Sequence, residues 1–353
     1  MQERISVCFC NDHEQIELLY VAIKSLVSEF EKTHRNEVFA LDIYIISIGL
    51  SDEMKRTIES CAGSSISVTR VIFLEYRLQG RYPLCRFRAS EIVTLVFFAP
   101  EFFPDLERII FLDSDVLITG DISELWDIDL RGRWLGIVDK AYDQSQRART
   151  IMRPLSALTT PVNSGTVLLD LVKMRTENIS HQLDSFMEKN QKWLRTPEQE
   201  AFEYVANNRI HLHHKWNWRG VAPVSEIYWS APTMKSVAEY EAIVPSVVHF
   251  QWPARPNRYH LDNPWFDRWN DYYDLLGLNP LTKKAYDLLL FTRMSVGTHR
   301  LGSSKKMRIL FRFSRHALVL LPTYIAYRLK LMGSRARALV KSNTIARPDS
   351  RPS

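Results

Sequence analysis

A buried-strand pattern that is interrupted by two carboxylates constrains this chain more than any other feature. Residues 108–118 read Arg-Ile-Ile-Phe-Leu-Asp-Ser-Asp-Val-Leu-Ile, so Asp113 and Asp115 lie inside an apolar, β-branched run. Such a run predicts a buried strand. Two carboxylates one residue apart at the end of a strand can share one hard divalent cation, and ligands collect at that edge of an open α/β sheet. We therefore predict a metal role for this pair; the alternative is a plain strand-to-turn pair of acids.

A second Asp-x-Asp sequence shows why the apolar run matters. At the usual frequency of Asp, a chain of this length contains about one such triplet by chance. Residues 127–129 read Asp-Ile-Asp and provide that second triplet. We interpret it as a solvated turn, because the long apolar run precedes only the first triplet.

The strand and helix patterns alternate over roughly the first 120 residues, which predicts a mainly parallel α/β sheet flanked by helices. The expected strands are 5–10, one within 38–49, 68–74, 108–117, 134–139 and 162–169. The expected helices are 16–30, 51–61 capped by Ser51, 91–98 closed by Pro100 and Pro104, 173–175, 181–189, and 198–205 with Thr196 as its N-cap. Residues 206–262 are predicted to be irregular and are rich in aromatic side chains.

The charge of the chain is unevenly distributed. Residues 305–353 contain twelve Lys or Arg and one acid, which gives +11, whereas the preceding 304 residues contain 34 basic and 39 acidic residues, which gives −5. Such asymmetry predicts a membrane surface or a nucleic acid as the partner of the basic part. We expect a catalytic body at 1–270, a helical extension and linker at 271–304, a basic tail at 305–341 and a disordered end at 342–353.

The basic tail has the pattern of an amphipathic helix. Basic residues recur at Arg308, Arg312 and Arg315, while Met307, Leu310, Phe311, Leu318 and Leu321 fall largely on another face. This arrangement favours a helix lying in an anionic membrane interface, where each basic residue contributes about 1 kcal/mol. The alternatives are a helix that packs on the body or on a partner, and nucleic-acid binding, for which the sequence carries no accompanying motif.

The cysteines and the apolar stretches bear on the compartment. The cysteines show neither zinc-type spacing nor a disulfide framework; they are Cys8, Cys10, Cys61 and Cys85. The chain has no signal-peptide pattern and no apolar stretch of membrane-spanning length. We therefore expect a cytoplasmic protein that is peripheral on the inner face of the plasma membrane.

Polar residues recur where the other predicted elements begin or end. Asn11 and Asp12 follow the first strand, where an amide or carboxylate can bind a uracil or a ribose; the alternative is an Asx turn or a cap for the helix 16–30. Asn163-Ser-Gly165 precedes an apolar strand, and a glycine there permits close backbone approach; the alternative is an ordinary turn.

Five further residues belong to the same group of candidates. Glu198-Gln199-Glu200 begins a helix, where acids also favour the helix dipole, so simple capping is the alternative. His249 follows an apolar run and can complete a metal site, although a lone histidine at a strand end is often structural. Arg255, six residues later, can bind a phosphate through two parallel hydrogen bonds.

In order and spacing, these motifs resemble family 8 of the retaining glycosyltransferases, enzymes with the GT-A fold. The resemblance covers about residues 5–260. The matching motifs are Asp12, Asp113-Ser114-Asp115, Asn163-Ser164-Gly165, Glu198-Gln199-Glu200, and His249 with Arg255-Pro256. The segment Phe111-Leu-Asp-Ser-Asp-Val-Leu, followed by Leu125-Trp126-Asp127, is especially close to the family pattern.

The resemblance implies a role for each matching residue. Asp113, Asp115 and His249 would bind Mn²⁺ or Mg²⁺, which neutralises the nucleotide diphosphate as it leaves. Gln199 would lie near the anomeric carbon, opposite the leaving group, and Asp139 would contact sugar; these two are the implied catalytic residues. The implied donor-binding residues are Asp12, Asn11, Asp113, Ser114, Asn163, Glu198 and Arg255.

Four positions depart from the family pattern. Glu198-Gln199-Glu200 replaces Asp-Gln-Asp, which lengthens both acids by one methylene. Arg255 replaces a lysine and keeps its charge but not its shape. Asn257 replaces a tryptophan. Val96 stands where the family has an arginine, for which Arg86 or Arg88 is a candidate replacement.

The activity implied by the resemblance is a metal-dependent, retaining transfer of a hexose from a nucleotide sugar, with a UDP-sugar expected. The acceptor expected is a saccharide such as lipopolysaccharide core or another cell-surface glycan. An amide is a poor nucleophile, so Gln199 favours same-face attack without a covalent intermediate. One alternative is a catalytically degenerate protein that binds sugar or acts as a scaffold. Another is an Asp-x-Asp phosphatase, but the residues Val116-Leu117 fit the usual pattern of those enzymes badly.

Overall fold

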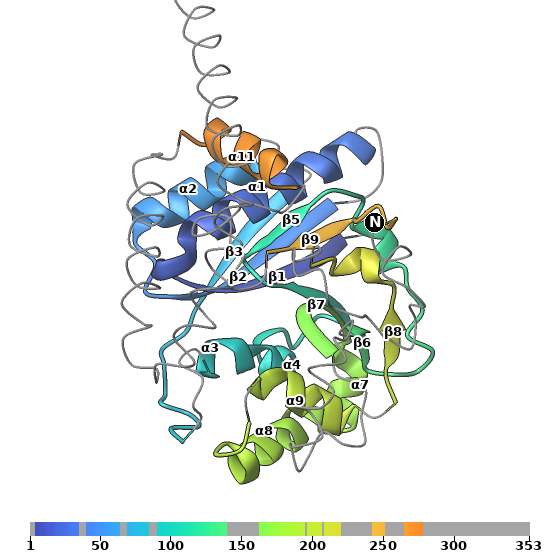
Figure 1. The fold of residues 1–353 in the computed structure, drawn as a ribbon. Helices are drawn as coiled ribbons and strands as arrows, with labels where there is room; N and C mark the ends of the chain where they lie inside the picture. Colours follow the sequence, from blue (N-terminus) through green and yellow to red (C-terminus); the bar gives the residue numbers. More distant parts are fainter. Residues whose placement is uncertain are drawn as a thin grey trace, which may run out of the picture. The chain divides into compact units, whose positions relative to one another are not determined.

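The computed structural model describes residues 4–34, 40–63, 69–84, 90–139, 162–194, 196–206, 208–219, 242–250 and 265–277. These residues belong to one compact unit, which extends from Met1 to Asn279 (Figure 1). The expected basic tail and the end that follows it lie outside the described residues. Within the described part, no helix is both long enough and apolar enough to cross a membrane.

The centre of this unit is a seven-stranded sheet with the strand order β3-β2-β1-β4-β7-β6-β8 (Figure 1). Four neighbouring pairs are parallel, and β7 runs antiparallel to both of its neighbours. The prediction of a mainly parallel α/β sheet is therefore confirmed. The strands are β1 (Arg4–Asp12), β2 (Ala40–Ile48), β3 (Thr69–Glu75), β4 (Arg108–Leu112), β6 (Leu135–Asp139), β7 (Val162–Asp170) and β8 (Ile210–Leu212).

The strands are apolar on both faces because the sheet separates two hydrophobic cores. In β1, Val7 and Phe9 belong to one core, and Cys8, which points the other way, belongs to the second. All three side chains are completely buried. Parallel strands covered on both faces require such continuous apolar runs, which is why they lack a polar–apolar alternation. Cys8 is thus a small residue of the second core.

One face of the sheet is covered by α1 (Ile16–Thr33), α2 (Asp52–Ala62) and α11 (Phe266–Leu275) (Figure 1). Ser51 caps α2 by accepting a hydrogen bond from the backbone N–H of Met54 at 3.3 Å, as predicted. Helix α11 is fastened to α1 through the Glu29 carboxylate, which accepts hydrogen bonds from Arg268 at 2.6 Å and Tyr272 at 3.2 Å. Helix α11, which lies far along the chain, is thereby fastened to the first helix.

The other face carries several short helices (Figure 1). They are α3 (Ser90–Thr94), η2 (Leu95–Phe98), α4 (Ala99–Phe102), α7 (Leu171–Thr176), α8 (Ile179–Asn190) and α9 (Pro197–Val205). The prediction of one helix at 91–98 closed by Pro100 was wrong. Pro100 lies in the first turn of α4, where a residue without an N–H costs no hydrogen bond, so it begins a helix instead of ending one.

The strand predicted at 108–117 is two strands. β4 ends at Leu112, and β5 (Val116–Ile118) leaves the main sheet to pair with β9 (Val247–His249) in a separate two-stranded sheet. The two carboxylates therefore lie in the turn between two sheets, and not within one strand. The segment predicted to be irregular contains β8, β9 and η3 (His214–Trp216). The remaining short elements are η1 (His13–Gln15) and α5 (Ser123–Trp126).

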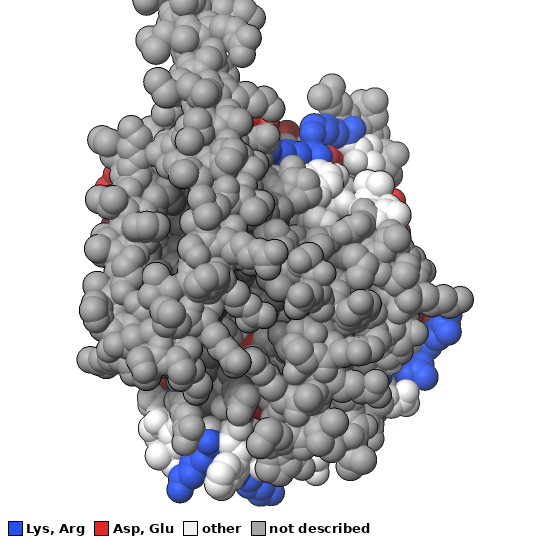
Figure 2. All heavy atoms as spheres, in the orientation of Figure 1, with Lys and Arg blue, Asp and Glu red and all other residues white. Residues whose placement is uncertain are grey.

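On the face drawn in Figure 2, the described Lys and Arg side chains lie in separate groups at the margins of the molecule. The predicted concentration of basic charge belongs to residues 305–353, which contain twelve of the 46 Lys and Arg residues.

Candidate active site

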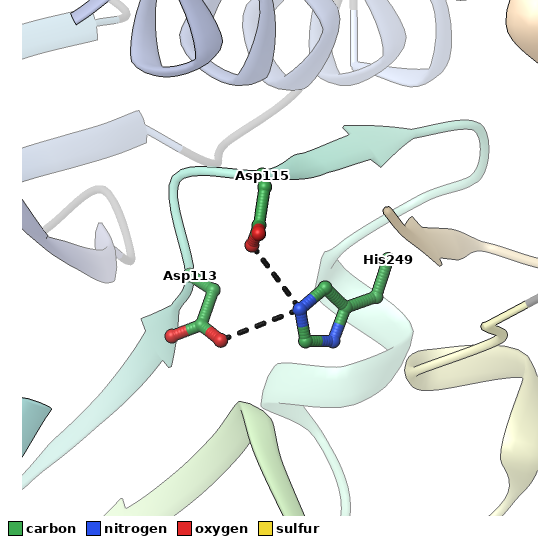
Figure 3. Close-up of side chains that lie close together, drawn as sticks. All are labelled: Asp113, Asp115 and His249. Atoms are coloured by element: carbon green, nitrogen blue, oxygen red, sulfur yellow. Dashed lines mark ion pairs between the residues drawn. The ribbon is translucent and has the colours of Figure 1, made fainter. Parts of the chain in front are cut away.

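Two carboxylates and one imidazole meet at the turn that joins the two sheets (Figure 3). Nε2 of His249 lies 3.1 Å from Oδ1 of Asp115 and 3.4 Å from Oδ2 of Asp113. The register of the small sheet creates this meeting, because Val116 in β5 pairs with His249 in β9. The backbone N–H of Phe250 donates to the carbonyl oxygen of Asp115 at 2.8 Å, which fixes the turn beside β9.

These three residues have the composition of a divalent-metal site. One ligand atom from each lies within 4.8 Å of the other two, and no other group of three or more His, Cys, Asp or Glu among the described residues has this spacing. Atoms bound to one ion at about 2.1 Å lie roughly 3–4 Å apart, so small adjustments would admit a cation. Carboxylate oxygens and a neutral imidazole suit Mn²⁺ and related ions. The residues that the sequence predicted as ligands are thus brought together.

The three side chains differ in burial, and burial and charge have opposite effects on the pKa of His249. The side chains of His249 and Asp115 are 3% and 4% exposed, whereas that of Asp113 is 48% exposed. Burial disfavours the imidazolium form, but the carboxylates of Asp115 and Asp113 outweigh burial and raise the pKa of His249. A bound cation would neutralise the same carboxylates and would replace the imidazole proton, since only the neutral ring ligates.

The opposite edge of the His249 ring faces two asparagines. Nδ1 lies 2.9 Å from Oδ1 of Asn217 and 3.2 Å from Oδ1 of Asn163. Asn163 also accepts a hydrogen bond from the backbone N–H of Gly165 at 3.1 Å. A Cβ atom on Gly165 would lie 2.2 Å from Nδ1 of His249, so only glycine leaves room for the ring. The Asn-x-Gly motif therefore needs glycine at position 165 because the His249 ring occupies the space of a side chain.

A second polar group lies at the N-terminus of α9. Glu198, Gln199 and Glu200 occupy its first turn and are all more than nine-tenths buried. Nε2 of Gln199 donates to Oε1 of Glu198 at 2.6 Å, and the Ser164 hydroxyl donates to the same oxygen at 3.2 Å. Oε1 of Gln199 is buried and accepts no hydrogen bond within the described part of the chain. These contacts join the Glu-Gln-Glu motif to the Asn-x-Gly motif.

Thr196 is the N-cap of α9 and Pro197 lies in its first turn, as predicted, although the Thr196 hydroxyl makes no capping hydrogen bond. The carbonyl oxygen of Thr196 accepts a hydrogen bond from the backbone N–H of Glu200 at 2.9 Å.

Asp139 ends β6 at the same edge of the sheet. The strand register pairs Val138 with Asn163, so Asp139 lies beside the Asn-x-Gly motif. Its carboxylate is 2% exposed and lies 2.8 Å from Nδ1 of His211 in β8. His211 could not be singled out from the sequence, because its neighbours in a three-residue strand carry no motif.

Asn11 and Asp12 end β1, which is parallel to β4 and pairs Phe9 with Leu112. Asp12 and the residues after Leu112 therefore leave the sheet at one edge. The side-chain amide of Asn11 donates to the carbonyl oxygen of Asp12 at 2.6 Å. The N-cap of α1 is Gln15, so neither residue caps that helix.

Ser114 lies between the two carboxylates in the same turn and is buried. Val96 packs into the second hydrophobic core from η2, 7% exposed, and has no polar role there. Arg255, Asn257, Arg86 and Arg88 lie outside the described residues.

Comparisons with known proteins agree with this arrangement. The family described as Glycosyl transferase family 8 matches residues 6–258. The probable galacturonosyltransferase 13 of Arabidopsis thaliana is 32% identical over 144 residues, which are 37% of this chain and 26% of that protein. Glycosyltransferase GlyF of Streptococcus pneumoniae is 22% identical over 283 residues, which are 77% of this chain and 62% of that protein. The chain thus spans less than two thirds of the length of these curated relatives.

Solved structures share the fold. The galactosyltransferase LgtC, solved in complex with donor and acceptor sugar analogues, superposes with a TM-score of 0.61 and 17% identity, over 80% of this chain and all of LgtC. The bifunctional glycosyltransferase WbbM in its apo form also has a TM-score of 0.61, with 16% identity, over 81% of this chain and 52% of that chain. With its family match over residues 6–258 and its mostly parallel sheet, the chain belongs to glycosyl transferase family 8 and has the GT-A fold.

Proposed function

We propose that the protein is a metal-dependent retaining glycosyltransferase that moves a hexose from a nucleotide sugar, expected to be a UDP-sugar, to a saccharide acceptor. The observation that carries this proposal is the convergence of Asp113, Asp115 and His249 in the turn between two sheets. Membership of family 8 supports the reaction class. The ion proposed is Mn²⁺, with Mg²⁺ as the alternative, because the ligands are two carboxylates and an imidazole.

A cation at this centre would stabilise the negative charge that gathers on the nucleoside diphosphate as the glycosidic bond breaks. In the proposal, Asp12 and Asn11 hold the nucleoside where β1 leaves the sheet, and Ser114 contacts the donor from the turn. Arg255 supplies a further positive charge to the phosphates.

The sugar of the donor is proposed to lie against the first turn of α9. Glu198 and Asn163 would contact its hydroxyls, and Asp139 would contact sugar from the end of β6. The hydrogen bond from Ser164 holds the longer Glu198 side chain in place, which supports a defined position for its carboxylate. Because the departures from the family pattern lengthen both acids, we expect them to influence which sugar is accepted.

Retention follows, in the proposal, from attack on the face that the diphosphate leaves. Gln199 is placed opposite that face; its amide is a poor nucleophile, and its Nε2 already donates to Glu198. The acceptor hydroxyl forms the new bond to the anomeric carbon, the bond to the phosphate oxygen breaks, and that oxygen takes the hydroxyl proton. Positioning and electrostatic stabilisation supply the acceleration in this scheme.

The acceptor and the location of the protein are further proposals. We propose a lipopolysaccharide-core or other cell-surface saccharide as the acceptor, and attachment to the inner face of the plasma membrane through residues 305–341. The support is the +11 charge of residues 305–353 beside apolar residues such as Leu310 and Phe311. A chain ending at Ser304 should lose binding to anionic vesicles. Full-length protein that ignores such vesicles at low salt would exclude the membrane role.

The test of the reaction is incubation with a panel of UDP-sugars, Mn²⁺ and saccharide acceptors, with UDP release and the anomeric configuration of the product as readouts. We expect a product of retained configuration, and no turnover by Asp113→Ala or Asp115→Ala. An inverted product would refute the retaining mechanism. Metal-dependent UDP binding without any turnover would instead identify a degenerate sugar-binding protein, and equal activity in both variants would refute the site.

A further inference from the structure

We infer that Asn217 is a positioning residue that fixes the tautomer of His249 and so prepares the metal centre. The inference rests on the proposed function, since it concerns the same centre. Asn217 belongs to none of the sequence motifs described above. It is 1% exposed and lies directly after η3, behind the imidazole ring as seen from the two carboxylates.

The hydrogen bonds of Asn217 determine which way its amide points. Nδ2 lies 3.1 Å from the carbonyl oxygen of Asn163 and 2.7 Å from Oδ1 of the same residue. Both of these atoms are acceptors, so the NH₂ group must face them, and both of its N–H bonds are used. A flipped amide would place its oxygen against two oxygens. Oδ1 of Asn217 is therefore the atom that faces His249.

The orientation of the amide then determines where the imidazole carries its proton. Oδ1 of Asn217 can only accept, and it lies 2.9 Å from Nδ1 of His249, so Nδ1 must donate. A neutral imidazole has one N–H, which leaves the lone pair on Nε2. That atom faces Asp115 at 3.1 Å and Asp113 at 3.4 Å. The ring is thus held in the tautomer that ligates through Nε2.

Asn163 alone does not account for this orientation. Its Oδ1 lies 3.2 Å from Nδ1 of His249, which is longer than the contact to Asn217. The same oxygen already accepts hydrogen bonds from the N–H of Gly165 at 3.1 Å and from Asn217 at 2.7 Å. With both lone pairs engaged, it has little capacity for a third donor. Asn217 is the principal acceptor for the His249 ring.

The backbone of the residue that follows Asn217 is tied to the strand that carries the histidine. The carbonyl oxygen of Trp218 accepts from the N–H of His249 at 2.7 Å, and the N–H of Trp218 donates to Val247 at 2.9 Å. Trp216 and Trp218 are both almost fully buried. Amide and imidazole are therefore held on one rigid unit, and their hydrogen bond does not depend on a mobile segment.

The test compares variants of the full-length protein by Mn²⁺ titration calorimetry and by NMR of ¹⁵N-labelled imidazole in the metal-free state, at a pH where His249 is neutral. Asn217→Leu removes the acceptor, and loss of a partner that orients a metal ligand typically costs about 10–100-fold in metal affinity. Asn190→Leu is the matched control, because Asn190 donates to Phe186 in α8, away from His249.

The expected result is a neutral His249 with its proton on Nδ1 in wild type and in Asn190→Leu, and a mixture of tautomers with weakened Mn²⁺ binding in Asn217→Leu alone. A wild-type ring protonated on Nε2 overturns the inference, even where Asn217→Leu does not fold. Wild-type Mn²⁺ affinity in a folded Asn217→Leu overturns it while leaving the proposed function intact. Wild-type protein that binds neither Mn²⁺ nor Mg²⁺, with or without UDP, overturns both.

Discussion

Replacing Gly165 with alanine should weaken metal binding by displacing the His249 ring, although no metal ligand is itself replaced. The added Cβ would lie 2.2 Å from Nδ1 and 2.3 Å from Cε1 of His249. An ordinary contact of that kind needs at least about 3.4 Å, so the ring would have to retreat by roughly 1.2 Å. The ring cannot yield by itself, because it ends a hydrogen-bonded strand and its backbone N–H is fixed to Trp218.

A movement of that size is large on the scale of metal coordination. Ligand distances in well-formed sites hold to about ±0.2 Å. Displacement of the ring would also break the hydrogen bond from Nδ1 to Asn217. We expect Gly165→Ala to lower Mn²⁺ affinity by at least tenfold and to lower the free energy of unfolding by about 1–3 kcal/mol, from overpacking and the lost hydrogen bond.

The assay is calorimetric titration with Mn²⁺ in the presence of UDP, combined with chemical denaturation of the metal-free protein. Gly136→Ala is the matched control: its Cβ would lie 3.0 Å from a methyl group of Leu130 and 3.2 Å from one of Leu212. It overpacks the core beneath the same sheet but does not touch His249. The control should lose stability and keep its Mn²⁺ affinity. Wild-type Mn²⁺ affinity in Gly165→Ala would show that the ring does not occupy the ligating position.

Three further predictions concern the sugar site and the acid stability of the sheet. Gln199→Ala should lower kcat by roughly 10–100-fold with donor affinity nearly unchanged, and a trapped glycosyl–enzyme adduct would contradict same-face attack. Ser164→Ala should free the Glu198 carboxylate and raise KM for the donor sugar several-fold without changing Mn²⁺ affinity; an unchanged KM would exclude this role. Burial raises the pKa of the Asp42 carboxyl, but its hydrogen bonds and ion pairs with Arg70 and Arg4 outweigh burial and lower that pKa. The contribution of Asp42 to stability is therefore present above about pH 3.9 and is lost as the pH falls through the lowered pKa. Asp42→Asn should therefore cost about 1–2 kcal/mol at neutral pH, with the difference from wild type shrinking in denaturation curves as the pH falls below about 3.9.

Local patterns in the sequence determined much of the sheet and the position of the site. The runs that form β1 and β2 are apolar because both faces are buried, and such runs are visible without any knowledge of their neighbours. Ser51 indicated the start of α2, because an N-cap side chain bonds to a backbone N–H only three residues later. Asp113 and Asp115 were recognisable because acids are costly inside an apolar run unless they have a partner or a ligand.

Only the tertiary structure decided how the site is assembled. The sequence predicted one strand at 108–117, but the chain turns at the carboxylates, and β5 pairs with β9, whose His249 is 133 residues beyond Val116. Pairing between segments so distant leaves no local signal, because it depends on the register and on the cost of closing the loop between them. For the same reason Asn217 and His211 could not be found from the sequence. The sequence indicated that Gly165 permits a close approach, but only the imidazole packed against it explains why no side chain fits there.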